Sequence, residues 1–167
     1  MIPAVNAVVR QLAEIEALLK RLDDDAYVDC LSAVSGTIGA HVRHALDHIA
    51  SLVEGIATGE CAYDRRVRGT DVERVRLAAI RTIRALSLAL TDLDLAELRR
   101  PIVVRVHVDR TGRESAFEST VERELAFLLS HTVHHNAIIA LLLEQAGIAA
   151  PHRFGVAVST PAPALAS

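Results

Sequence analysis

Two histidines four residues apart, His131 and His135, lie within a long apolar stretch near the end of the chain. In a helix of about 3.6 residues per turn they share a face with aliphatic residues, and His134 lies nearer its edge. A lone histidine on such a face is most often a core residue with one hydrogen-bond partner. The i, i+4 spacing also lets one helix present two ring nitrogens to a single metal ion. Spacing alone leaves both interpretations open.

A second group of histidines, His41, His44 and His48, falls within two turns of an earlier predicted helix. At about 100° per residue the three share a face that borders an aliphatic stripe. This is where a bundle helix meets its neighbour, so the group is a candidate source of a further metal ligand. Any one of these histidines alone is more typical of the solvent edge of a helix. Asp47 lies among them and is a candidate general base by proximity.

The sequence lacks the motifs of several other kinds of active site. The chain has no Glu-x-x-His pair for a di-iron site, no His-Glu-x-x-His, no Gly-x-Ser-x-Gly and no phosphate-binding loop. Covalent haem is excluded because Cys-x-x-Cys-His is absent, whereas haem bound by two histidines stays open. Cys30 and Cys61 lack zinc-finger spacing, which favours free thiols over a disulfide without excluding one.

Helical periodicity predicts four long helices to position these residues. The first covers residues 3–22, and the second residues 35–58 or 37–58, depending on whether Ser35 or Thr37 is the cap. The third covers residues 70–90, with a continuation to residue 98 left open, and the fourth residues 119–147. Capping boxes begin the third helix at Thr70 with Glu73 and the fourth at Ser119 with Glu122. Polar loops are expected between the first three helices, including an arginine-rich loop over residues 60–69.

The segment between the third and fourth helices alternates apolar and polar residues over residues 102–108, which predicts a strand. A turn at residues 109–113 and a second strand at residues 114–118 complete a hairpin outside the helical core. We therefore predict an all-α fold, a four-helix bundle with a short β-hairpin in the crossover between helices three and four. Residues 1–158 form the single domain, ending in an arm, and residues 159–167 a flexible tail.

Composition narrows the class of protein. The 167 residues are 51% hydrophobic but only 3% aromatic, so the core is aliphatic, which favours packed helices. A net charge of −3 without a basic stripe argues against nucleic acid as a partner. No signal sequence and no run of about eighteen apolar residues is found, which predicts a cytoplasmic protein without a membrane partner.

With both histidine segments placed, the chain resembles the DinB-like superfamily, which includes YfiT-like metal-dependent hydrolases and bacterial thiol-dependent transferases. The resemblance covers nearly the whole chain. It rests on four stretches: Gly-x-His-x-x-His-x-x-Asp-His from Gly39, Tyr63-Asp64-x-Arg66-x-Arg68, Ser-Thr-Val-x-Arg-Glu-Leu from Ser119, and His131-x-x-His134-His135. The Phe-Gly-Val-Ala stretch from Phe154 is also similar.

The resemblance implies a divalent ion, zinc, nickel or iron, held by His44, His131 and His135. His48 is the rival of His44, because it lies closer to the centre of the apolar face. The resemblance leaves four further residues as alternative ligands or as residues that contact the ligands: His48, His41, His134 and Asp47. The implied function is that of a metal-dependent hydrolase or thiol transferase with a small-molecule substrate, in a homodimer. The alternative is a metal-binding or purely structural dimeric bundle without catalysis.

Overall fold

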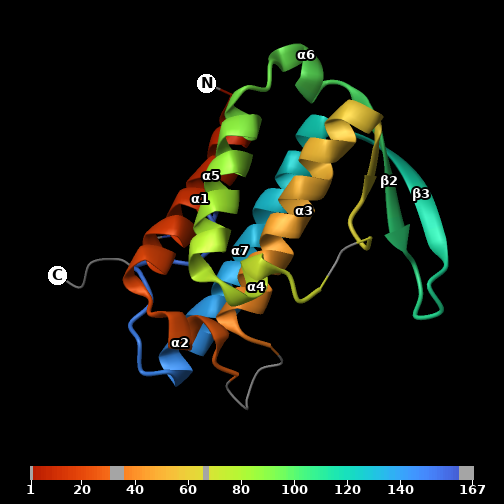
Figure 1. The fold of residues 1–167 in the computed structure, drawn as a ribbon. Coiled ribbons are helices and arrows are strands. Elements are labelled where there is room, and N and C mark those ends of the chain that lie inside the picture. Colours follow the sequence, from red (N-terminus) through yellow and green to blue (C-terminus); the bar gives the residue numbers. More distant parts are fainter. Residues whose placement is uncertain (1, 31–35, 66–67, 162–167) are drawn as a thin grey trace.

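The computed structural model describes residues 2–30, 36–65 and 68–161. Within these ranges the chain forms seven helices, four of them long, and a three-stranded mixed sheet. The long helices are α1 (Pro3–Arg21), α3 (Ile38–Thr58), α5 (Arg76–Thr91) and α7 (Val121–Gln145). Helices α1 and α3 each pack on both α5 and α7, so the four helices enclose one aliphatic core (Figure 1). The prediction of a mainly helical fold is thus confirmed, and a third strand joins the predicted hairpin.

Side-chain caps set where α3 and α7 begin, and so which faces their histidines occupy. Thr37 caps α3 by accepting a hydrogen bond from the Ala40 N–H at 3.0 Å, whereas Ser35 lies outside the described residues. The cap of α7 is Thr120, which accepts from the Arg123 N–H at 3.3 Å, so the predicted Ser119 cap is wrong by one residue. The hydroxyl of Ser119 instead donates to Glu124 at 2.6 Å.

The predicted third helix, from residue 70 to residue 90 or 98, is not one continuous helix in the structure. The structure divides it into α4 (Asp71–Arg74), α5 and α6 (Leu95–Leu98), with an extended residue, Val75, between the first two. The Glu73 carboxylate does not complete a capping box with Thr70, because it accepts the Gly69 N–H and pairs with Arg43 of α3 at 3.0 Å. Helix α6 begins at its own capping box, formed by Asp94 and Glu97.

Two predicted loops contain regular structure. Residues 23–36 include α2 (Asp24–Val28), whose start is capped by Asp23 and whose Tyr27 is completely buried. Residues 60–69 include the strand β1 (Glu60–Ala62), which pairs in parallel with β2 (Pro101–His107). The predicted hairpin is confirmed, since β2 pairs antiparallel with β3 (Glu114–Thr120). In Figure 1 the sheet lies beside α3, away from α1 and α5.

The C-terminal arm packs on α7. Phe154 is buried, and the left-handed backbone of Gly155, with φ of 74°, lies against the backbone of Ala137. The Arg153 guanidinium donates to the Thr160 carbonyl at 2.6 Å, which ties residue 160 to the arm. Residues 162–167 of the predicted flexible tail lie outside the described residues.

Helix α7 is, among the described residues, the one helix long and apolar enough to cross a membrane by length and composition. A core helix of a bundle meets the same criteria, and α7 packs on both α1 and α3. It also buries polar side chains, including Asn136, which donates to Gln11 of α1 at 3.0 Å. These contacts fit a bundle core.

Candidate metal centre

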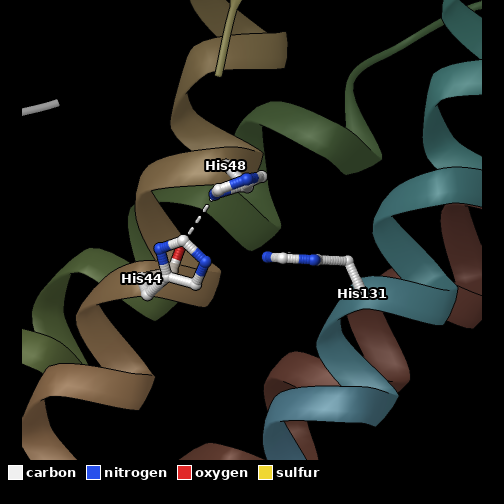
Figure 2. A group of neighbouring side chains, drawn as sticks. All are labelled: His44, His48 and His131. Carbon is white, nitrogen blue, oxygen red and sulfur yellow. Dashed lines mark hydrogen bonds between the residues drawn. The ribbon is translucent and has the colours of Figure 1, made fainter. Parts of the chain in front are cut away.

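Histidines of α3 and α7 meet where the two helices pack (Figure 2). His44, His48 and His131 each place one ring nitrogen within 4.8 Å of the corresponding nitrogens of the other two. The ring centroids are 4.4 Å apart between His44 and His48, 4.1 Å between His48 and His131, and 5.0 Å between His44 and His131. Three imidazoles from two facing helices can converge on one divalent ion.

A backbone hydrogen bond decides the tautomer of His48. Its Nδ1 lies 3.1 Å from the carbonyl oxygen of His44, shown as the dashed line in Figure 2. A carbonyl oxygen can only accept, so Nδ1 carries the proton of the neutral ring and donates it. The lone pair of the neutral His48 ring therefore lies on Nε2. An outer hydrogen bond of this kind is typical of metal-binding histidines.

His135, a predicted ligand, lies at the edge of this group. Its ring centroid is 4.4 Å from that of His44 and 4.6 Å from that of His131. Its Nδ1 lies 3.0 Å from Nδ1 of His41, so one of these two nitrogens donates and the other accepts. Only the tautomer in which His135 donates leaves its Nε2 lone pair available to a metal. The His41 contact therefore controls whether His135 can act as a ligand.

The His135 ring is neutral near pH 7. Burial lowers its pKa to about 3, with smaller contributions from the neighbouring imidazoles, of which His131 is the largest. A neutral imidazole is the form that binds a metal, whereas an imidazolium would repel it. His135 is therefore in the protonation state that metal binding requires.

The remaining sequence-predicted residues lie around the cluster. His134 is exposed, with its ring centroid 5.3 Å from that of His135. Asp47 is half-buried and accepts a hydrogen bond from the buried Arg43 guanidinium at 2.7 Å. His48 and His135 are buried, while His44 and His131 are half-buried, so the cluster keeps an accessible side.

Two aromatic rings cover another side of the cluster. The Tyr63 ring stacks on His48 with centroids 5.1 Å apart, and the Phe127 ring stacks on His131 at 5.6 Å. The Tyr63 hydroxyl donates to Glu124 at 2.8 Å, and Glu124 is only 1% exposed. Burial raises the pKa of Tyr63 well above its ordinary value, so the phenol stays a donor. No sequence motif indicates this contact, because its partners are 61 positions apart.

Known proteins resemble this chain in sequence and in fold. A DinB superfamily model matches residues 7–139. A protein of Rhizopus delemar named FK506-binding protein 5 is 30% identical over 99 residues, which are 59% of this chain and 26% of that protein. This chain therefore spans about a quarter of that relative. The structure of a DinB-like protein from Bacillus subtilis superposes with a TM-score of 0.67 at 18% identity, covering 92% of this chain and 98% of that one. The chain belongs to the DinB superfamily.

Proposed function

We propose that the chain binds one divalent metal ion through His44, His48 and His131. The observation that carries this proposal is the convergence of three imidazole nitrogens within 4.8 Å. An all-nitrogen donor set suits borderline ions such as zinc, nickel or iron(II) and does not suit calcium or magnesium, which prefer oxygen ligands. The resemblance to the superfamily assigns His135 in place of His48. We prefer His48 because one of its ring nitrogens belongs to the group of three that lie within 4.8 Å of one another.

Three imidazoles leave at least one coordination position open, as in catalytic rather than closed structural sites. A bound ion would supply Lewis acidity, lowering the pKa of a coordinated water or keeping a thiol deprotonated. Residues around the ion would orient one ligand and shield the site from water. His48 is oriented by the His44 carbonyl, and the rings of Tyr63 and Phe127 exclude water from one side. We propose on this basis a metal-dependent hydrolase or thiol transferase acting on a small molecule.

A specific observation favours the alternative of a metal-binding protein without catalysis. Two carboxylates beside the cluster are each paired with an arginine: Asp47, next to His48 in sequence, with Arg43 at 2.7 Å, and Glu124, the partner of Tyr63, with Arg123 at 3.0 Å. A carboxylate engaged in this way is a poor general base. Turnover would therefore depend on the metal-bound nucleophile itself.

Metal titration tests the proposal. Metal-free protein purified without a histidine tag should bind one zinc or nickel ion per chain in calorimetry. His131→Ala should lose stoichiometric binding while its far-ultraviolet circular dichroism stays helical, because His131 is half-buried and α7 is held by its aliphatic face. The exposed His152→Ala is the matched control and should bind as wild type does. Absence of stoichiometric binding by the wild-type protein would refute the metal centre.

We also propose that the chain is a cytoplasmic homodimer, as the resemblance and the composition imply. Helix α5 exposes two large apolar side chains, Leu77 and Leu88, which a second copy of the chain could cover. Light scattering at micromolar concentration should give twice the mass of the chain. A monomer mass at that concentration would count against the dimer.

A further inference from the structure

We propose that a pocket beside the histidine cluster binds the aromatic body of an uncharged or singly cationic small molecule. The pocket has a volume of about 420 Å³, within the range typical of small-molecule sites. It lies between the sheet and the start of α7. This inference rests on the proposed function, because it couples the pocket to the metal centre through aromatic rings that contact both.

The walls of the pocket are apolar and aromatic. Val104 and Val106 project from the same face of β2, and Phe117 of β3 lies directly across from Val104 in the sheet. Phe127 of α7 and Tyr63 complete the lining of rings. Phe117 is 53% exposed, which leaves much of a large apolar side chain in contact with water. An aromatic ligand would remove that surface from solvent and stack on the rings.

Two aromatic rings, those of Tyr63 and Phe127, separate the pocket from the histidine cluster. Tyr63 and Phe127 line the pocket, and the same rings stack on His48 and His131. Their centroids are 5.2 Å apart, so they form one continuous wall. A ligand in the pocket therefore lies one ring away from two proposed metal ligands. This contact couples occupancy of the pocket to the geometry of the metal centre.

The charges in the lining select against anions. The lining contains one guanidinium, Arg123, and two carboxylates, Glu118 and Glu124, whose formal charges sum to −1. Arg123 already pairs with Glu124 at 3.0 Å and lies 5.9 Å from the centroid of the Phe127 ring. A ligand carboxylate or sulfonate would share this cation with Glu124 and would approach the Glu118 carboxylate. An uncharged or singly cationic ligand avoids that repulsion.

Two fluorescent probes with one skeleton test this selectivity. N-phenyl-1-naphthylamine is uncharged, and 8-anilinonaphthalene-1-sulfonate carries a sulfonate on the same rings. The uncharged probe should bind saturably, one per chain, and about tenfold or more tighter than the sulfonate, a difference of about 1.4 kcal/mol. Replacing the exposed Glu118 by Gln should narrow this ratio, because it removes one carboxylate from the lining. Equal affinity for both probes would refute the charge argument.

Matched variants locate the binding site. Phe117→Ala should weaken binding of the uncharged probe by about tenfold, a loss of about 1.4 kcal/mol. Leu141→Ala is the control, because Leu141 is 54% exposed on α7 and does not line the pocket. Equal effects of the two substitutions, or one probe per two chains, would overturn the assignment and indicate nonspecific binding or a subunit interface.

Coupling to the metal centre gives a readout independent of activity. In cobalt-loaded protein the uncharged probe should alter the visible absorption of cobalt(II), since the shared rings contact His48 and His131. An unchanged cobalt spectrum at saturating probe would overturn the assignment of the pocket to the metal centre. Probe binding is also measured in metal-free protein and in His131→Ala. These measurements distinguish a failure of the proposed pocket from a failure of the proposed metal centre. Metal binding without probe binding refutes the pocket alone, and probe binding without metal binding refutes the metal centre alone.

Discussion

The ring of Tyr63 stacks on the ring of His48 with an angle of 8° between their planes and centroids 5.1 Å apart. The hydroxyl of the same tyrosine donates to Glu124, a nearly completely buried residue in the first turn of α7. Glu124 also accepts from Ser119 at 2.6 Å and from Arg123 at 3.0 Å. A buried carboxylate thus holds in place the aromatic ring that covers a proposed metal ligand. Such outer contacts set ligand orientation in metal sites.

Tyr63→Phe separates the two roles of this residue. It removes the hydroxyl donor to buried Glu124 and should lower the free energy of unfolding by about 1–3 kcal/mol in urea denaturation. It keeps the ring on His48, so calorimetry should give a metal affinity close to that of the wild-type protein. Tyr63→Ala removes the ring as well and should weaken metal binding by about 10–100-fold. Equal metal affinities of the two variants would show that the stacked ring does not support His48.

The third metal ligand can be identified by comparing His48→Ala with His135→Ala. We expect His48→Ala to lose stoichiometric zinc binding, because the substitution removes one of the three converging ring nitrogens. His135→Ala should keep one zinc per chain with an affinity at most about 10–100-fold weaker, since His135 then contributes only outer contacts. Calorimetry on the two variants measures both values. The reverse result would support the ligand set implied by the superfamily resemblance, with His135 as the ligand.

Metal-free protein should lose stability in acid through His135. Its folded-state pKa of about 3 lies below the ordinary value of 6.5, so between these values the unfolded chain binds more protons than the folded one. The free energy of unfolding therefore falls as pH falls from 6.5 toward 3, by at most about 1.4 kcal/mol per pH unit for one proton. Urea denaturation across this window should show a flatter slope for His135→Gln. The exposed His152→Gln is the control and should keep the wild-type slope.

Gly155→Ala tests the packing of the C-terminal arm on α7. Gly155 has φ of 74°, and a Cβ there would overlap the backbone of Ala137. Gly112 has a similar φ of 83° but no atom within 4 Å of its Cβ position, so Gly112→Ala carries the conformational cost alone. That cost is about 1–2 kcal/mol. Thermal unfolding should show a clearly larger loss of stability for Gly155→Ala. Equal losses would mean that the arm does not pack closely against Ala137.

Local periodicity was sufficient to predict much of the fold. Helices α1, α3 and α7 follow from apolar spacing and from start signals such as Thr37 before α3. The hairpin of β2 and β3 follows from alternation around a turn. The same periodicity placed two histidine groups on helix faces, and the motifs identified the DinB superfamily. A further local signal, the Asp94 and Glu97 capping box, would have predicted α6.

Other features depend on contacts between distant segments. The break at Val75 accompanies the pairing of Glu73 with Arg43, which lies on another helix. The strand β1 forms because Cys61 pairs with Val104 of β2, and three residues are too few to show a strand period. Glu124 meets Tyr63 only when the start of α7 packs beside the loop after β1. The local sequence of one segment does not indicate which distant residues it will contact.

The histidine cluster shows most directly which features follow from the sequence alone and which depend on tertiary packing. The sequence by itself determined that His44 and His48 share one helix face and that His131 and His135 share another, because a helical period depends only on local spacing. Which histidines converge depends on how α3 and α7 rotate and cross, and packing of their aliphatic residues decides this. In the folded chain that packing brings His48 together with His44 and His131, and it sets His135 against His41.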